Sequence, residues 1–345
     1  YQTDLLTNRL LPGTEDFSNA LNDITSRISF LEGGTGFYDK SALNHLHAEY
    51  QISPKFSEIK FGFNIREYLP DSKGSIFMDT ASKISNREYG IYSGIETDLS
   101  KNKIKINGTI RLDKNENFNF NFSPAASIIY KNNDHIFRLS FSSAIRNPTL
   151  SDQYLYYNVG RAILIGNLSG HGKDYGENLV TIQSLVNYFL PSLEERSKDS
   201  LQFFSVNPIR PEKAKSAEIG YRTTLFDKIY VDANYYYSKY IDFIGYKLGV
   251  KYQTLQDDTI TGAYEISLPS IQVYRMAANA ENIVTTKGAS IGINYFMTPN
   301  ITINGNYSWN KLNKAGSEDP IIPAYNTPEH KYNIGISTRD IHLSN

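Results

Sequence analysis

The chain has 345 residues, a formal net charge of -1 and no cysteine. This length suits either two or three soluble domains or most of one large barrel, so it does not decide the class of protein. The lack of cysteine excludes disulfides, thiol nucleophiles and thiolate metal sites. Lysine and arginine are scattered, without the basic stripe that nucleic-acid binding requires. We therefore expect no nucleic-acid partner.

Hydropathy excludes a helical membrane protein. The mean hydropathy is -0.42, and the longest apolar stretches, such as Ile163 to Ile165, are far shorter than the ~20 residues of a spanning helix. A transmembrane barrel stays possible, because only alternate residues of its strands face lipid. The chain has 26 Tyr and 18 Phe, and such rings suit the two boundaries between water and lipid. Soluble sandwiches and carbohydrate-binding modules can also have Tyr-rich strands.

The beginning of the chain is the least regular part. Residues Tyr1 to Leu11 show no cationic start followed by an apolar core, so no signal peptide is visible. Because a barrel needs one, we expect that it was cleaved or that the sequence is an excerpt. Residues Asp16 to Phe30 fit a short amphipathic helix about as well as a strand.

From about Ile59 onward, apolar and polar residues alternate strictly. In the segment from Ile104 to Asp113 the isoleucines share one face of a strand, whereas a helix would scatter them. The other clear segments are Ile59 to Arg66, Phe118 to Phe122, Phe137 to Ser142, Ile229 to Ser238 and Ile301 to Asn310. There are roughly a dozen, many near the ~9 to 11 residues of a tilted membrane strand. The pattern predicts an all-β fold, an antiparallel transmembrane β-barrel.

Connections alternate between short and long. Tight turns are expected at Phe226 to Lys228 and at Met297 to Asn300, whereas residues 151–213, Lys247 to Ser270 and Asn310 to Glu329 are long. Such lengths usually indicate functional loops. Short periplasmic turns opposite long external loops are typical of outer-membrane barrels, so we predict that residues 151–213 form a long extracellular loop.

Residue types offer little for catalysis. His45 and His47 share a face of a strand, as two metal ligands could, but no third ligand is seen, and an ordinary polar face explains the pair better. No Gly-x-Ser-x-Gly motif or catalytic dyad is present. We expect no catalytic residues, no metal site, no cofactor and no enzyme activity.

The long segment 151–213 carries the candidate ligand-binding residues. Aromatic rings give a large contact area at modest entropic cost, although these rings could instead pack the loop on itself. The candidates are Tyr154, Tyr156, Tyr157, Phe203 and Phe204.

Two stretches resemble a known family. Residues 137 to 150, FRLSFSSAIRNPTL, resemble the strand of TonB-dependent outer-membrane receptors that ends in an Arg-x-Pro-Thr corner. Residues 207 to 222, NPIRPEKAKSAEIGYR, are similar to the next landmark, an Asn-Pro and a Pro-Glu before a strand reading Glu-x-Gly. Upstream, Lys73 to Thr80 (KGSIFMDT) are similar to receptors of the Bacteroidetes type. The matching residues are Arg146, Asn147, Pro148, Asn207, Pro208, Pro211, Glu212, Glu218 and Gly220, which we expect to be structural.

The resemblance implies active import of a scarce ligand, with energy passed by TonB to a plug inside a 22-stranded barrel in the outer membrane of a Gram-negative bacterium. The implied partners are TonB, through a plug not seen in this sequence, outer-membrane lipid, and an unidentified small or oligomeric ligand. An iron chelate, cobalamin, a sugar and a peptide are all possible. Because the plug and the last strands are also not seen, we expect residues 1–345 to be part of the barrel.

Two other classes of protein remain open. One is a passive barrel, either porin-like or an outer-membrane enzyme with its chemistry on loops, and a plug encoded upstream would exclude it. The other is a secreted all-β binding module, whose strands would be shorter, with polar outward faces. The long apolar alternation favours the receptor.

Overall fold

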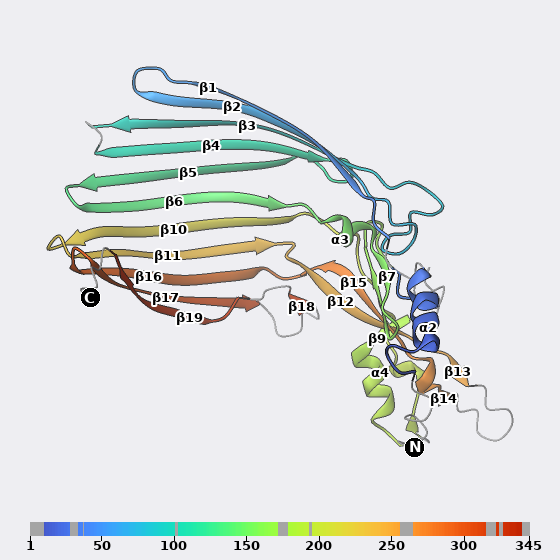
Figure 1. The fold of residues 1–345 in the computed structure, drawn as a ribbon. Coiled ribbons are helices and arrows are strands. Elements are labelled where there is room, and N and C mark those ends of the chain that lie inside the picture. The colour runs from blue at the N-terminus through green and yellow to red at the C-terminus, as the bar shows by residue number, and fades with distance from the viewer. Residues whose placement is uncertain are drawn as a thin grey trace.

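The computed structural model describes residues 10–27, 34–36, 38–100, 103–171, 179–192, 195–255, 265–314, 322–323 and 327–339. Its main feature is one sheet of 11 strands, all pairing antiparallel, which curves as an open wall (Figure 1). In spatial order the strands of this wall are β1 (Ala42–Ile52), β2 (Ser57–Leu69), β3 (Asn86–Leu99), β4 (Ile104–Asn115), β5 (Asn121–Asn132), β6 (His135–Arg146), β10 (Glu212–Leu225), β11 (Ile229–Ile241), β16 (Val284–Thr298), β17 (Ile301–Lys314) and β19 (His330–Thr338).

The register of the wall separates an apolar face from a polar one. Ile128, Leu139, Ile219 and Tyr235 lie opposite one another on successive strands, and residues opposed in a ladder point to the same face. The neighbouring positions place Ser140 opposite Glu218 on the other face. The alternation in the sequence therefore predicted the two faces correctly, as expected for a wall with lipid outside and water inside.

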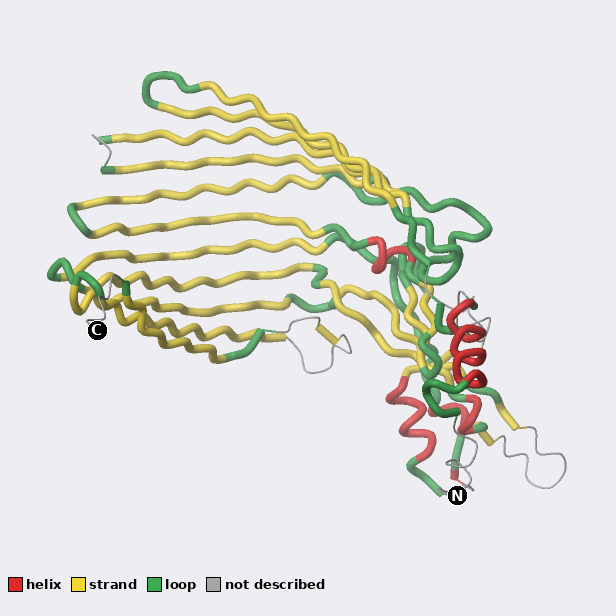
Figure 2. The backbone as a smooth tube through the Cα atoms, in the orientation of Figure 1, coloured by secondary structure: helices red, strands yellow, loops and turns green. Residues whose placement is uncertain are grey.

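The two ends of the wall differ. At one end, the turn end, β1 to β2, β3 to β4, β5 to β6, β10 to β11 and β16 to β17 are joined by short turns. At the other end, the loop end, residues 70–85, 147–211 and 242–283 form long connections, as Figure 2 shows. The alternation of short and long connections expected from the sequence is therefore present.

The long connections build a second, smaller sheet at the loop end (Figure 1). Its strands come from residues 156–181, from the chain after β11, and from residues 322–323. They are β7 (Tyr156–Asn158), β8 (Ala162–Ile165), β9 (Leu179–Thr181), β12 (Ile244–Lys251), β15 (Gln272–Asn279) and β18 (Ile322–Pro323). The short pair β13 (Thr254–Leu255) and β14 (Glu265–Ile266) and the helical elements α3 (Leu150–Tyr154), α4 (Ile182–Phe189), η4 (Lys198–Ser200) and η5 (Leu268–Ser270) complete this region.

The apolar core of the described residues lies in and around this second sheet. Ile163, Met276 and Phe204 belong to its largest buried cluster, and Val180, Leu185 and Tyr188 to another. Among the described residues Val284 is the only buried apolar side chain that belongs to a wall strand. The wall has no core of its own, because one of its faces is apolar and outward and the other is polar.

The region before the wall contains one described helix, α2 (Glu15–Ser26). The Oγ1 of Thr14 accepts a hydrogen bond from the backbone N–H of Phe17 at 3.3 Å, which satisfies one free donor of the first turn. Of the two alternatives for Asp16 to Phe30, the helix is therefore correct up to Ser26, while residues 28–30, like Tyr1 to Arg9, lie outside the described residues. No helix in the described part of the chain is long and apolar enough to cross a membrane.

The elements differ from the expected segments in three places. Phe118 to Phe122 is not one strand: β4 ends at Asn115, Phe118 lies in a turn against Ile209 and Ile244, and β5 begins at Asn121. The segment 151–213 contains the short strands β9 and β8, which pair with β12 and β15, and its extracellular position stays a prediction. Likewise β12 occupies the start of 247–270 and β17 continues to Lys314, while residues 256–264, 315–321 and 324–326 lie outside the described part.

Candidate functional site

A polar cavity of about 760 Å³ lies on the inner face of the wall at the loop end. It is walled by β2, β3 and β4 on one side and by the corner that follows β6 on the other. Its polar lining includes Asn64, Arg66, Glu88, Arg111, Asp113, Asn147 and Gln153. A ligand that moves along the inner face of the wall would meet this cavity where the long connections begin.

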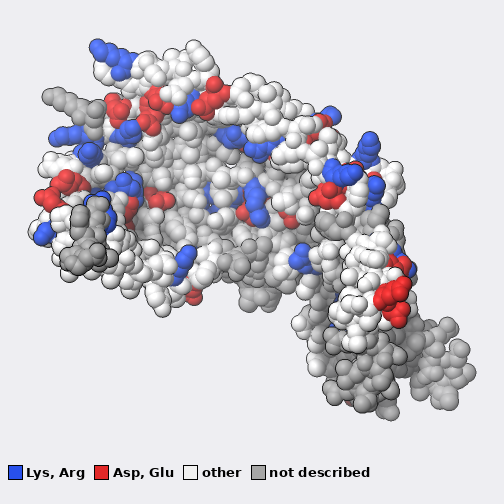
Figure 3. All heavy atoms as spheres, viewed as in Figure 1, with Lys and Arg blue, Asp and Glu red and all other residues white. Residues whose placement is uncertain are grey.

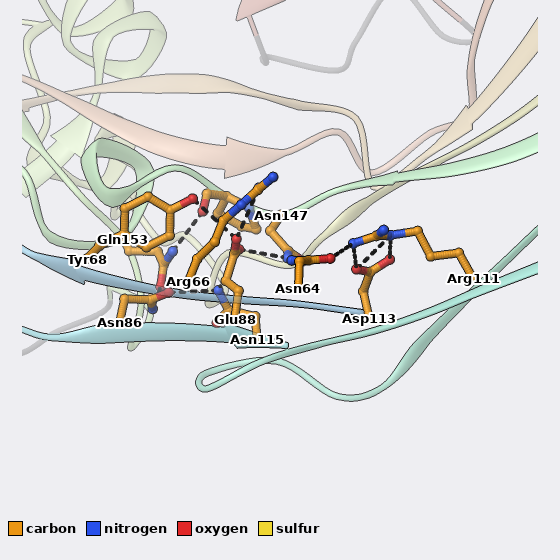
Figure 4. Close-up of polar contacts among 11 residues, drawn as sticks. Asn64, Arg66, Tyr68, Asn86, Glu88, Arg111, Asp113, Asn115, Asn147 and Gln153 are labelled. Carbon is orange, nitrogen blue, oxygen red and sulfur yellow. Dashed lines mark hydrogen bonds and ion pairs between the residues drawn. The ribbon is translucent and has the colours of Figure 1, made fainter. Parts of the chain in front are cut away.

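Glu88 on β3 is the centre of the hydrogen bonds in this cavity (Figure 4). Its Oε1 accepts from Asn147 Nδ2 at 3.0 Å and from Asn115 Nδ2 at 3.1 Å. Its Oε2 accepts from the Tyr68 hydroxyl at 3.3 Å and lies 4.0 Å from the Arg66 guanidinium. Hydrogen bonds to an ionised carboxylate are stronger than those between neutral groups, so Glu88 joins three wall strands to the corner after β6.

A chain of buried amides continues from Glu88 to helix α3. Asn115 Nδ2 donates to Asn86 Oδ1 at 2.8 Å, and Asn86 Nδ2 donates to Gln153 Oε1 at 3.2 Å. Gln153, only 4% exposed, accepts a second bond from Asn117 at 2.8 Å and donates to the carbonyl of Pro148 at 2.7 Å. Because unmatched buried amides are costly, this chain fixes α3 against the rims of β3 and β4.

Next to this chain, Arg111 is held by its own neighbours. Its guanidinium donates to the carboxylate of Asp113 at 2.6 Å and to Asn64 Oδ1 at 2.6 Å. A Cβ at Gly90 would lie 2.3 Å from Arg111 Nη2 and 2.5 Å from Asn64 Oδ1. The glycine on β3 therefore leaves the space through which Arg111 reaches Asn64.

The charges of the cavity are balanced. Arg111 faces Asp113, Arg66 lies near Glu88, and Arg146 pairs with Glu212 at 3.0 Å. Figure 3 shows blue and red groups together on the hollow side of the wall. The cavity is thus suited to hydrogen bonding with a polar ligand rather than to attraction of one sign of charge.

The family-motif residues at the corner tie the wall to the second sheet. Arg146 donates to Glu212 Oε2 and to the carbonyl of Ile244 at 3.3 Å. The same Glu212 oxygen accepts from the backbone N–H of Ile244 at 2.8 Å. Pro148 is buried beside Asn147, and its carbonyl receives the bond from Gln153. This cluster therefore anchors β12, the strand of the second sheet that directly follows β11.

The Glu-x-Gly motif of β10 lies in the middle of the inner face. Glu218 Oε1 accepts from Asn234 Nδ2 at 3.2 Å. A Cβ at Gly220 would lie 2.7 Å from Arg138 Nε, and Arg138 passes over β10 to reach Asp232 of β11 at 2.6 Å. The absence of a side chain at Gly220 therefore allows an ion pair that crosses a whole strand.

The Asn-Pro and Pro-Glu residues lead the chain from the second sheet back to the wall. The carbonyl of Asn207 accepts from Asn167 Nδ2 at 2.7 Å. Pro208 lies against Gly170, where an added Cβ would be 2.9 Å from its Cδ and where φ is +83°. Pro211 is half-buried directly before β10. These contacts put the nine motif residues at corners and strand ends, apart from Glu218 and Gly220.

The five candidate ligand-binding aromatics do not share one environment. Phe204 is 4% exposed and belongs to the core of the second sheet, with Tyr156 packed against the same cluster. Tyr154 is half-buried and accepts a bond from Asn117 Nδ2 at 2.6 Å. Phe203 is 60% exposed and Tyr157 is 37% exposed. Of the five rings, these two are the most open to a ligand.

The two histidines of β1 do not gather further ligands. His47 Nε2 lies 2.9 Å from the hydroxyl of Tyr92, which donates to Glu49 at 2.7 Å. Within the described ranges no group of three or more His, Asp or Glu side chains is arranged to hold a metal ion.

The sequence did not point to Asn86, Asn115, Gln153 or Glu88. They occupy strand ends or a short helix, where asparagine and glutamine are ordinary, and their partners are up to 67 residues away. The useful signal was the Arg146 to Pro148 corner itself, because the network converges on it.

Comparison with known proteins identifies the class. Residues 2–340 match the family described as TonB dependent receptor-like, beta-barrel. The chain therefore belongs to this family, whose members lie in the outer membrane of Gram-negative bacteria, and the resemblance seen in the sequence is confirmed. A search of curated proteins found no match. The likeness of Lys73 to Thr80 to Bacteroidetes receptors stays a prediction.

Solved structures show the same fold. The chain is similar to the FrpB iron transporter from Neisseria meningitidis (F3-3 variant), with a TM-score of 0.52, 14% identity, and coverage of 87% of this chain and 41% of that one. For the siderophore receptor PirA from Pseudomonas aeruginosa these values are 0.52, 13%, 81% and 44%. For the copper transporter OprC they are 0.52, 14%, 87% and 42%. The chain thus spans less than half the length of these proteins.

Proposed function

We propose that this chain is the ligand-facing part of the wall of a receptor that imports a scarce ligand actively, with energy passed from TonB through a plug. The observation that carries the proposal is the network of hydrogen bonds that joins the inner cavity to the long connections at the loop end. Glu88, Asn147 and Gln153 join the wall strands to α3. Ligand contacts on segment 151–213 would thus be mechanically linked to the lumen.

The cavity and the similar structures support a proposal for the class of ligand. Balanced ion pairs and amides suit a polar ligand of low net charge, such as a chelated metal, and the similar solved proteins are named as iron, siderophore and copper transporters. A metal chelate is therefore the first candidate, before cobalamin, a sugar or a peptide. Exposed Phe203 and Tyr157 would contact it on the outside.

The test is uptake by the complete natural chain expressed in a Gram-negative host. A heat-modifiable barrel and accumulation of a radiolabelled ferric chelate that disappears when the tonB gene is deleted would support the proposal. Accumulation that is indifferent to TonB would support a passive barrel instead, and a soluble product would support a binding module. A panel with cobalamin, an oligosaccharide and a peptide separates a wrong ligand from a wrong mechanism. No enzyme activity is proposed.

A further inference from the structure

Arg66 on β2 is the least engaged guanidinium in the lining of the inner cavity. Its Nη1 lies 4.0 Å from Glu88 Oε2, and its side chain is 43% exposed. The hydroxyl of Tyr68 lies close to it as well. A guanidinium has five N–H donors, so most of those of Arg66 have no acceptor among the described residues. Figure 4 shows the side chain extending past Glu88, away from the strands, and these donors are therefore open to a ligand.

Glu88 does not hold Arg66 closely, because its oxygens are already occupied. Oε1 accepts from Asn147 and Asn115, and Oε2 accepts from Tyr68. An arginine and a free carboxylate would instead form a short pair with two parallel hydrogen bonds. The three neutral donors around Glu88 therefore leave the guanidinium of Arg66 available.

The other carboxylates of the lining do not bind Arg66 either. Both oxygens of Asp113 accept from Arg111, and Asp39 is exposed to solvent. Asn64 Oδ1 also accepts from Arg111, and its Nδ2 makes no hydrogen bond with a described residue. The formal charges of the cavity are thus balanced, but its hydrogen-bonding groups are not, because N–H donors that a ligand can reach are in surplus.

We propose that Arg66 binds a carboxylate of the ligand, and that the inner cavity therefore selects ligands with a carboxylate at their surface. The planar guanidinium matches a carboxylate in shape and can donate two hydrogen bonds to it. One such group suffices, because the guanidinium groups of Arg111 and Arg146 are paired with Asp113 and Glu212. The inference rests on the proposed function, since it names the group by which the imported ligand is held in the same cavity. A metal chelate with one peripheral carboxylate meets both requirements.

The experiment is equilibrium dialysis of three ferric chelates against the complete natural chain, purified in detergent. The probes share the hydroxamate core of ferrioxamine B and differ at one end. That end is an ammonium in the parent compound, a neutral acetamide after acetylation and a carboxylate after succinylation. The wild type should bind the succinylated chelate roughly tenfold or more tightly than the acetylated one, since a hydrogen bond to a charged group is gained. The parent chelate should bind the most weakly.

The test variant is Arg66→Gln, and the matched control is Arg87→Gln. Arg66 lies opposite Glu88, whereas Arg87 lies opposite Glu67 on the other face of the same two strands and pairs with it at 2.8 Å. Arg66→Gln should weaken binding of the succinylated chelate roughly ten- to hundredfold and leave the acetylated chelate unchanged. Arg66→Lys keeps the charge without the planar fork, so it should lose less than Arg66→Gln. Arg87→Gln should bind all three chelates as the wild type does.

Thermal unfolding separates lost binding from lost structure. Exposed ion pairs contribute little to stability, so Arg66→Gln and Arg87→Gln should both unfold as the wild type does. Dialysis does not involve TonB, so a carboxylate preference that disappears in Arg66→Gln supports the inference even if uptake is indifferent to TonB. Equal affinity for the three chelates, binding of none of them, or a preference that survives in Arg66→Gln would overturn it. None of these three results would contradict TonB-dependent uptake of another ligand.

Discussion

Asn147 donates a hydrogen bond of 3.0 Å to the carboxylate of Glu88, and this bond joins the corner after β6 to the third strand of the wall. The two residues are 59 positions apart in the sequence. Through Glu88 the corner also reaches Asn115, and through Gln153 it reaches Asn86. The start of the long segment 147–211 is therefore held by the wall and does not hang free.

Replacing Asn147 by alanine should loosen this corner. A hydrogen bond to a charged group contributes about 1.5 to 3 kcal/mol, so we expect a loss of this size in the free energy of unfolding in denaturant. Faster cleavage by protease within residues 147–211 should accompany it. Asn119→Ala is the matched control, because the exposed Asn119 side chain makes no hydrogen bond with a described residue. Equal behaviour of the two variants would exclude the anchoring role of Asn147.

Gly166, directly after β8, should not tolerate a side chain. A Cβ there would lie 2.4 Å from the backbone nitrogen of Tyr154 and 2.5 Å from the carbonyl carbon of Gln153. Backbone atoms cannot rotate away, so Gly166→Ala should displace α3 and cost about 3 kcal/mol, the upper range for overpacking. Thermal unfolding would measure the loss. The control is Gly292→Ala, because a Cβ at Gly292 would have its nearest neighbour 3.9 Å away. This variant should unfold as the wild type does.

The wall could be predicted from the sequence because its signal is local. Each strand alternates apolar and polar residues, and the face of Ile104 to Asp113 follows from that period alone. The second sheet could not, because β8 pairs in parallel with β15, more than a hundred residues later. Phe118 to Phe122 alternates as a strand would, but Phe118 is needed in the core under the loop end. Local period cannot distinguish these cases.

The candidate site was predictable only in part, for the same reason. The corner Arg146 to Pro148 stood out by resemblance, and the structure joins it to Glu212 and Gln153. The aromatics of segment 151–213 stood out by composition, yet composition does not tell which rings are buried. Phe203 and Phe204 are neighbours with opposite environments, because successive residues of an extended chain point to opposite sides.

Acid should release the loop formed by Ser72 to Asp79. Burial raises the pKa of the Asp79 carboxyl, but the hydrogen bonds from the backbone N–H groups of Ser72 and Gly74 outweigh it, so the pKa is lowered from 3.8. A carboxyl group whose pKa is lower in the folded than in the unfolded protein stabilises the fold at pH values above the unfolded pKa. This contribution is lost as the pH falls from the unfolded pKa through the folded pKa.

The protection of residues 72–79 against hydrogen exchange, taken relative to the intrinsic amide rate at each pH, should therefore be high at neutral pH and fall near pH ~3, an acidity on the order of the ordinary carboxyl pKa. In Asp79→Asn this protection should already be lower at neutral pH and should change less with acidification, because no charge is left to neutralise. An identical pH dependence in the variant would show that another group controls the loop.

The adjacent phenylalanines separate folding from ligand contact. Phe204 is 4% exposed in the core of the second sheet, and a Cβ at Gly249 would lie 2.8 Å from its ring. Removing this ring leaves a cavity, so Phe204→Ala should cost about 3 to 5 kcal/mol. Phe203 is 60% exposed, and Phe203→Ala should leave the free energy of unfolding within about 0.5 kcal/mol of the wild type.

If Phe203 contacts the ligand, Phe203→Ala lowers uptake at limiting ligand concentration while the stability is unchanged. Normal uptake by Phe203→Ala would leave Tyr157 as the exposed ring to test, and a stable Phe204→Ala would contradict the core assigned to the second sheet.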